Sequence, residues 1–150
     1  MNDSWPLAER FNLKDYSFLL ALGSPWDETA DKALRAGGVV SQSAKVLEEV
    51  IQALEFQQVD FLLFSEGFGA SDLKADPLLE YIQQLPAADR RNFFVALISP
   101  QFRSGDLWTA FSYSVNLVLN PGDLPELTEK LERSWSLWKD QYRIYLQSPK

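Results

Sequence analysis

The chain contains neither cysteine nor histidine. Without cysteine it can form no disulfide, no thiolate nucleophile and no cysteine-based zinc site. Without histidine it also lacks the general base of Ser-His-Asp and Cys-His catalysis and the commonest side-chain ligand of metals. We therefore expect a protein that is not an enzyme and that holds no metal or cofactor.

Positive charge and long apolar runs are also scarce. Lys and Arg number 14 against 21 for Asp and Glu, and a net charge of −7 would repel the phosphate backbone of nucleic acid. No run approaches the roughly 18 to 20 apolar residues that a membrane span needs, and the N-terminus MNDSWPLAERFNLKDY lacks a basic region followed by an apolar one. We expect a soluble, cytoplasmic protein with no nucleic acid or membrane partner.

Apolar residues are plentiful and form several runs of strand length. With 46% hydrophobic residues in a length of 150, the chain can bury one sizeable core, so we expect one domain. Continuous rather than alternating hydrophobicity is typical of strands that are covered on both faces. The expected strands are Phe18 to Leu22, Val59 to Phe64, Phe93 to Ile98 and Leu117 to Leu119, with a weaker strand from Val39 to Ala44.

Helical start and stop signals lie between these strands, as capping residues at helix starts and Gly or Pro at helix ends. The first expected helix begins at Ser24-Pro25 and closes at Gly37-Gly38, and the second begins after Ser43 as its cap. The third begins at Asp76-Pro77 and stops at Pro86, and the fourth covers about 105–114. The last helix runs from Asp123, with Glu126 as its capping-box partner, to about Leu146. Arg90-Arg91 is expected in a solvated linker between a helix and a strand. Strands that alternate with helices predict an α/β fold in which helices cover both faces of a parallel sheet.

Polar residues follow four of the apolar strands. Because the carboxyl ends of parallel strands lie at one edge of the sheet, these residues should share one rim, where such sheets bind ligands. They are Gly23-Ser24, Ser65-Glu66, Ser99-Pro100 and Asn120-Pro121.

From Asp15 to Trp135 the chain resembles a CheY-like response-regulator receiver domain. The resemblance is carried by the spacing of the strand and helix units and by three segments, which read DFLLFSEGFG, FFVALIS and LVLNPGDLPEL. It implies a doubly wound, five-stranded parallel sheet of order 2-1-3-4-5 with an extended C-terminal helix. It also implies a part in signal transduction of the bacterial two-component kind.

The residues that a receiver uses for phosphoryl transfer are largely replaced. A receiver places an aspartate nucleophile after its third strand, Mg²⁺-binding acids after the first, a hydroxyl after the fourth and a lysine after the fifth. In this chain the nucleophile position is occupied by Ser65, and the acidic positions are occupied by Leu22, Gly23 and Ser24. Ser99 occupies the position of the hydroxyl and Asn120 that of the lysine. Leu117 occupies the position of an aromatic switch residue in the fifth strand. The resemblance thus implies a degenerate pseudo-receiver that lacks the phosphoacceptor aspartate.

Two functions from different classes follow from this pattern. The first is a non-phosphorylatable signalling module that binds a protein partner through the helix over about 105–114, the strand over 117–119 and the last helix. Trp108, Phe111 and Tyr113 lie on this face, where they either contact a partner or pack against the sheet. The alternative is a small-ligand sensor whose rim pocket is formed by Ser24, Ser65, Glu66, Ser99 and Asn120.

The last helix is longer than the sheet requires. From Leu124 to Leu146 it would span roughly 34 Å, and its apolar stripe continues to the end. The stripe consists of Leu127, Leu131, Trp135, Trp138, Tyr142 and Tyr145. Either an N-terminal arm over residues 1–14, through Trp5, Leu7, Phe11 and Leu13, or a second copy in a dimer should cover it. We expect a domain over 15–150 whose helical extension covers 136–147, with Trp135, Trp138 and Tyr142 in an interface.

Overall fold

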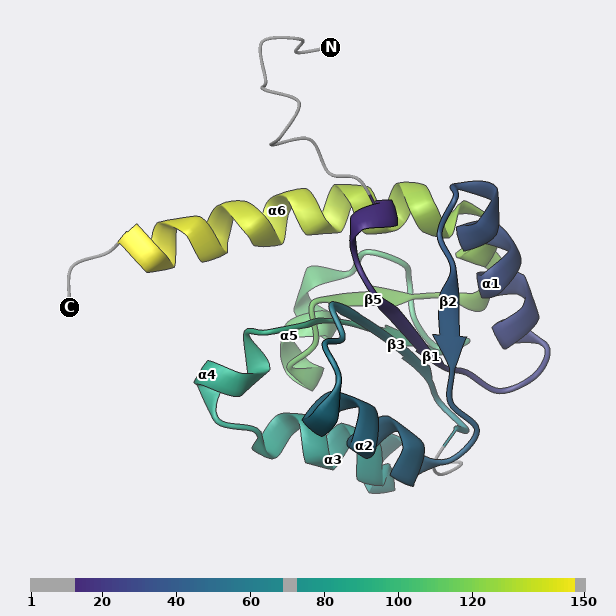
Figure 1. The fold of residues 1–150 in the computed structure, drawn as a ribbon, viewed down its shortest axis with the longest axis horizontal. Helices are drawn as coiled ribbons and strands as arrows, with labels where there is room; N and C mark the ends of the chain where they lie inside the picture. Colours follow the sequence, from purple (N-terminus) through teal and green to yellow (C-terminus); the bar gives the residue numbers. More distant parts are fainter. Residues whose placement is uncertain (1–12, 69–72, 148–150) are drawn as a thin grey trace, which may run out of the picture.

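A computed structural model of the chain describes residues 13–68 and 73–147, with side chains described as far as Leu137. Its sheet has five parallel strands in the order β2-β1-β3-β4-β5, with helices on both faces (Figure 1). This confirms the predicted α/β class and strand order. None of the helices in the described part of the chain is both long and apolar enough to span a membrane.

The elements alternate along the chain as the hydrophobic pattern predicted. The strands are β1 (Phe18–Ala21), β2 (Ser41–Ser43), β3 (Phe61–Ser65), β4 (Phe94–Ile98) and β5 (Leu117–Leu119). The helices are α1 (Trp26–Ala36), α2 (Leu47–Phe56), α3 (Pro77–Gln84), α4 (Ala87–Arg90), α5 (Leu107–Tyr113) and α6 (Leu127–Gln147). Short 3-10 helices occur at η2 (Leu13–Asp15), η3 (Leu73–Ala75) and η4 (Pro121–Glu126).

The sheet is covered on both faces, which explains why β1, β3, β4 and β5 are apolar along nearly their whole length, whereas the edge strand β2 is polar and partly exposed. In β3, Leu62 and Phe64 pack in the layer of α2, α3 and α5, whereas Phe61 and Leu63 pack in the layer of α1 and α6. All four side chains are fully buried. Burial of each such side chain contributes about 1.5–3 kcal/mol to folding, so the two layers supply much of the driving force.

Helix α6 begins on the sheet and continues past it. Leu127 and Leu131 are fully buried, and the ring of Trp135 lies 5.4 Å from the rings of both Tyr16 and Phe61. Figure 1 shows the C-terminal half of α6 projecting beyond the body of the domain. The ring of Trp135 therefore packs against the core of its own chain and is half-buried, and its place in an interface stays a prediction.

Part of the predicted contact between α6 and its cover lies outside the described residues. This part comprises the side chains of Trp138, Tyr142 and Tyr145 on the α6 stripe and Trp5, Leu7 and Phe11 of the N-terminal arm. Leu13 is described, and at 4% exposure it is buried with the α1 and α6 layer of the core.

Of the four N-terminal caps that the sequence predicted, one is correct and three are wrong. Asp76 caps α3 as expected, because its side chain accepts the backbone N–H groups of Leu78 and Leu79. Neither Ser24 nor Ser43 caps a helix, since α1 starts after Pro25 and α2 after Val46, both without a side-chain cap. The last helical segment starts with η4, which is capped by Asn120 instead of Asp123. Ser43 is the last residue of β2, and Ser24 lies in the loop between β1 and α1.

Arg90 is not part of a solvated linker, which corrects the expectation for Arg90-Arg91. Its guanidinium donates hydrogen bonds to the carbonyl oxygens of Phe93 at 2.9 Å and Ser114 at 3.2 Å, and to Asn116 Oδ1 at 2.8 Å. Burial lowers the pKa of Arg90 to about 10. The side chain therefore fastens the end of α5 to the segment that precedes β4.

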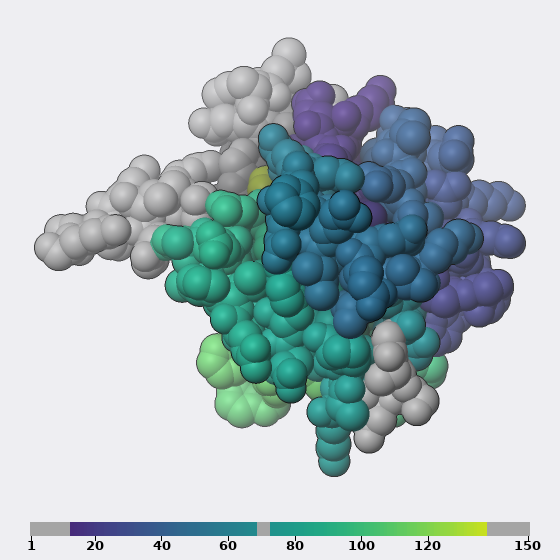
Figure 2. Space-filling model, turned by 60° about the horizontal axis from the view of Figure 1, so that its bottom comes forward, coloured from purple at the N-terminus to yellow at the C-terminus, as the bar shows by residue number. Residues whose placement is uncertain are grey.

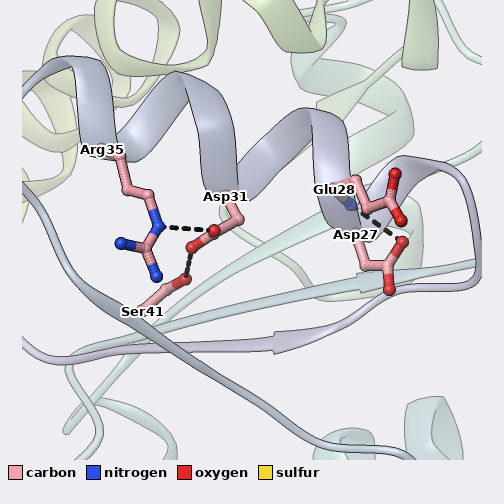
Figure 3. Close-up of polar contacts among 5 residues, drawn as sticks. All are labelled: Asp27, Glu28, Asp31, Arg35 and Ser41. Carbon is pink, nitrogen blue, oxygen red and sulfur yellow. Dashed lines mark hydrogen bonds and ion pairs between the residues drawn. The ribbon is translucent and has the colours of Figure 1, made fainter.

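Helix α1 is fastened to the edge strand β2 by a polar cluster that Figure 3 shows. Asp31 accepts hydrogen bonds from Arg35 Nε at 2.7 Å and from Ser41 Oγ at 2.8 Å. The bonds from Arg35 and then Ser41 lower the pKa of the Asp31 carboxyl. Asp27 and Glu28 lie at the first turn of the same helix, where Asp27 Oδ1 accepts the backbone N–H of Glu28 (Figure 3).

Candidate functional site

The polar residues singled out in the sequence lie at one edge of the sheet. The register aligns Ala21 with Phe64, Ser65 with Ile98, and Ile98 with Leu119, so β1, β3, β4 and β5 end side by side. We call this edge, with Ser24, Ser65, Glu66, Ser99 and Asn120, the rim. Within the rim, each side chain has a different environment.

Ser65 is the last residue of β3 and is completely buried, with 0% of its surface exposed. Its Oγ accepts a hydrogen bond from the backbone N–H of Gly23 at 3.2 Å. The hydroxyl thus connects the end of β3 to the loop that follows β1. A serine with no neighbouring base is a weak nucleophile, and burial closes this one to solvent.

Glu66 and Ser99 are joined directly. Ser99 is also fully buried, and its Oγ donates a hydrogen bond of 2.5 Å to Glu66 Oε1. The side-chain amide of Gln101 donates to the other carboxylate oxygen of Glu66 at 3.3 Å, and its backbone N–H donates to Ser99 Oγ at 3.1 Å. The carboxylate of Glu66 is thereby held by two side chains that follow β4.

Asn120 connects the end of β5 to the loop between β4 and α5. Its Nδ2 donates to the carbonyl oxygens of Pro100 at 3.2 Å and Phe102 at 2.9 Å, while Oδ1 accepts the N–H of Gly122 at 2.9 Å. Its backbone N–H donates to Ser104 Oγ, and the Ser104 hydroxyl in turn donates to Asp123. Asn120 therefore provides hydrogen bonds that shape this loop.

Ser24 lies apart from the other rim residues. It is exposed and borders a hollow of about 280 Å³ together with Asp27, Lys45 and Phe68. This hollow, which we call the rim hollow, is bordered by residues that follow β1, β2 and β3. None of the other four rim residues lines it.

In the structure, therefore, only Glu66 and Ser99 of the rim residues are shown bonded to each other. The side chains of Ser65 and Asn120 bond to backbone groups instead. Gln101 bonds to Ser99 and Glu66, and Ser104 bonds to Asn120. Neither residue was singled out in the sequence, because polar residues in a loop after a strand form no distinctive pattern. Among the side chains that the structure describes, which end at Leu137, no group of three or more acidic residues is placed to hold a metal ion.

The aromatic residues of α5 divide between solvent and core. Trp108 and Phe111 are each 78% exposed, Leu107 is 70% exposed, and the two rings stack with centroids 6.2 Å apart. Tyr113 instead packs on Phe102 with ring centroids 5.5 Å apart. Leu107, Trp108 and Phe111 thus form an exposed apolar surface, which we call the α5 patch.

Comparison with known proteins supports the fold. No protein-family model matches the chain, and no curated protein matches its sequence. Among solved structures, a candidate response regulator from Chloroflexus aurantiacus aligns with a TM-score of 0.56 and 17% identity, over 79% of this chain and 98% of that one. The beryllofluoride-activated receiver domain of nitrogen regulatory protein C aligns with a TM-score of 0.55 and 20% identity, over 82% of this chain and 95% of that one. The chain has the fold of a receiver domain, as its sequence predicted.

Proposed function

We propose that this chain is a pseudo-receiver, a signalling module that acts by binding a protein partner and does not accept a phosphoryl group. The main support is the complete burial of Ser65, which occupies the nucleophile position and whose hydroxyl is bonded to Gly23. The positions of the Mg²⁺-binding acids are held by Leu22, Gly23 and Ser24, which provide no carboxylate for a hard cation. Signalling itself is inferred from the fold by analogy.

Binding of a protein partner is inferred from the α5 patch. Large aromatic and aliphatic side chains exposed together are common at interfaces, where a few of them carry most of the binding energy. We place the docking surface on α5, β5 and α6, with Trp108 and Phe111 as its anchors and Tyr113 behind them.

The absence of phosphoryl chemistry can be tested with beryllofluoride and Mg²⁺, which together mimic a bound phosphoryl group. We expect no saturable change in tryptophan fluorescence or in amide NMR shifts when both are added. A saturable response centred on Ser65 and Glu66 would contradict the proposal. A receiver domain that retains its aspartate serves as the positive control.

Docking can be tested by substituting the anchors and measuring recovery of partners from a cell extract. We expect Trp108→Ala and Phe111→Ala to abolish binding of a reproducible protein partner. Phe56→Ala is a matched control, because Phe56 is also 78% exposed but lies on α2. Loss of the partner in the control alone would move the docking surface away from α5.

A small-ligand sensor is the second candidate, and the rim hollow is the observation that favours it. Its volume of about 280 Å³ would hold only a small molecule, and of the five rim residues only Ser24 borders it. A retained small molecule whose NMR contacts include Ser24, Asp27 and Phe68, in a protein that binds no partner, would favour this second function.

We also propose a homodimer in which α6 takes part. The helix has 21 residues, about 31 Å in length, and projects past the sheet with Leu137 56% exposed (Figure 1). A two-fold contact would cover that surface. Light scattering should give a dimer mass at micromolar concentrations, and a monomer mass throughout would instead favour the N-terminal arm as the cover.

A further inference from the structure

A second hollow lies at the edge of the sheet opposite the rim. It has a volume of about 650 Å³ and is bordered by the ends of α2 and α3, by α4, and by the segments that lead into β3 and β4. Figure 2 shows the segments that contain α2 and α3, coloured blue and teal, side by side on the face that comes forward. We call this space the amino-end hollow, and its size is within the range of ligand sites.

The lining of the amino-end hollow is apolar at its base and polar at its mouth. Val59 and Phe93 are buried, with 9% and 6% exposure, and form the base. Glu55 and Asp89 also line the hollow but are exposed, so they stand at its mouth. Tyr81 is half-buried and forms a wall between the two levels. A ligand for this space therefore needs both an apolar part and a polar group.

The charged side chains of the lining favour a cation as the polar group. The lining contains the carboxylates Glu55, Asp60 and Asp89 and no Lys or Arg; its other polar side chains are the neutral Tyr81, Gln57, Gln58 and Asn92. Glu55 Oε2 accepts a hydrogen bond from the Tyr81 hydroxyl at 3.3 Å. The pKa of Tyr81 is raised by burial and then by the negative charges of Glu55 and Asp89, so both carboxylates act on the same hydroxyl.

The adjacent Arg90 is positively charged, and its guanidinium lies 5.3 Å from the centre of the Phe93 ring. Its hydrogen bonds go to Phe93 O, Ser114 O and Asn116 Oδ1, and within the described residues it forms no ion pair with Glu55 or Asp89. The three carboxylates of the lining therefore outnumber this one cation.

We propose that the amino-end hollow binds a small aliphatic amine. The ammonium group would lie beside Glu55 and Asp89, and the methylene chain would cover Val59 and Phe93. Charge-assisted hydrogen bonds and burial of apolar surface would then act together, and the net charge of −7 would favour the approach of a cation. This site is independent of the pseudo-receiver proposal, because it lies at the other end of the strands.

The test is a titration with 1,4-diaminobutane at low ionic strength, followed by amide NMR. We expect saturable shifts at Val59, Tyr81 and Phe93, and no such shifts with butane-1,4-diol, which has the same chain but no charge. Replacing both Glu55→Gln and Asp89→Asn should weaken binding by about tenfold or more. The control, Glu48→Gln with Glu80→Gln, makes the same change in net charge on α2 and α3 with residues outside the lining, and should bind as the wild type does.

Other results would overturn the proposal. The proposal is wrong if the diamine causes no saturable shifts, or if the diol binds with equal affinity. It is also wrong if the Glu48 and Glu80 control weakens binding as much as the Glu55 and Asp89 variant, because equal weakening indicates non-specific charge attraction. If the diamine fails and a lysine-rich peptide shifts the same amides, the hollow takes a basic side chain of a protein partner instead. Circular dichroism of both variants establishes that they are folded, so weakened binding can be assigned to the site.

Discussion

The hydroxyl of Ser99 donates a hydrogen bond to the carboxylate of Glu66 across 2.5 Å, and this bond joins the ends of β4 and β3. Both residues lie at the edge of the sheet where a receiver carries out its chemistry. In this chain that edge is held together by its own polar side chains. The hydroxyl of Ser99 and the carboxylate of Glu66 therefore stabilise the loops that follow β4 and β3.

Replacing Ser99→Ala should destabilise the protein. The substitution removes the donor to Glu66 and the acceptor for the N–H of Gln101, and a net loss of about 1–2 kcal/mol in the free energy of unfolding is expected. Urea denaturation measures the change. Ser112→Ala is the control, because the Ser112 hydroxyl bonds to Trp108 O on an exposed surface and its loss should cost less than about 0.5 kcal/mol. Equal effects of the two substitutions would contradict the role given to Ser99.

Asp76 should make stability depend on pH in an unusual direction. It is 2% exposed, and burial raises the pKa of its carboxyl against the opposing hydrogen bonds from Leu79 and Leu78. Because the folded-state pKa is raised, ionisation penalises the folded state. That penalty is absent below the unfolded pKa near 3.8 and is complete above the folded pKa.

Asp76→Ser keeps a capping oxygen and removes the buried charge, so it isolates this effect. The stability of the wild type relative to Asp76→Ser should rise as the pH falls from neutral through the folded pKa. Asp76→Ala, which loses the cap as well, should be about 1 kcal/mol less stable than Asp76→Ser at every pH. Urea denaturation at neutral and at acidic pH tests both statements. A wild-type advantage that does not change with pH would show that Asp76 has no raised pKa.

The sheet could be predicted from the sequence because its signal is local. Strands buried on both faces are apolar at every position, as in the FLLF segment of β3, and Asp76-Pro77 and Pro86 mark the two ends of α3. Many of the polar contacts could not be predicted in this way, because they depend on a partner distant in the chain. Asp123 has the spacing of a capping box with Glu126, yet it accepts the hydroxyl of Ser104, which comes from the loop before α5.

Long-range contacts also explain the errors at the candidate site. The sequence placed five polar residues on one rim, and the strand register brings their positions together, but it gave no indication that Ser65 is buried while Ser24 is exposed. Nor could it show that Arg90 and Asn116, which are 26 residues apart, are hydrogen-bonded. Such contacts are fixed by the tertiary fold and have no local pattern.

Arg90→Ala should destabilise the protein more than substitutions of exposed charged residues do. It removes the donor to two carbonyl oxygens and to Asn116 Oδ1, and leaves these acceptors partly buried, for an expected loss of about 2–4 kcal/mol. Arg103→Ala is the matched control, because Arg103 is exposed, and it should change stability by less than about 0.5 kcal/mol. Arg90→Lys should recover only part of the loss, since an ammonium cannot reproduce the planar guanidinium. Full recovery by lysine would indicate that charge alone, and not geometry, fastens α5.

Trp108→Ala and Phe111→Ala should leave stability within about 0.5 kcal/mol of the wild type, because both side chains are 78% exposed. In contrast, Leu131→Ala should cost about 2–5 kcal/mol, because Leu131 is fully buried on the face of α6 that packs on the sheet. This difference gives the docking experiment its meaning: a partner lost from a variant that is as stable as the wild type is lost from an interface. If the two α5 substitutions instead destabilise the protein by an amount that grows with protein concentration, the α5 patch is covered by a second copy. In that case the patch belongs to the dimer contact, and the partner surface must lie elsewhere.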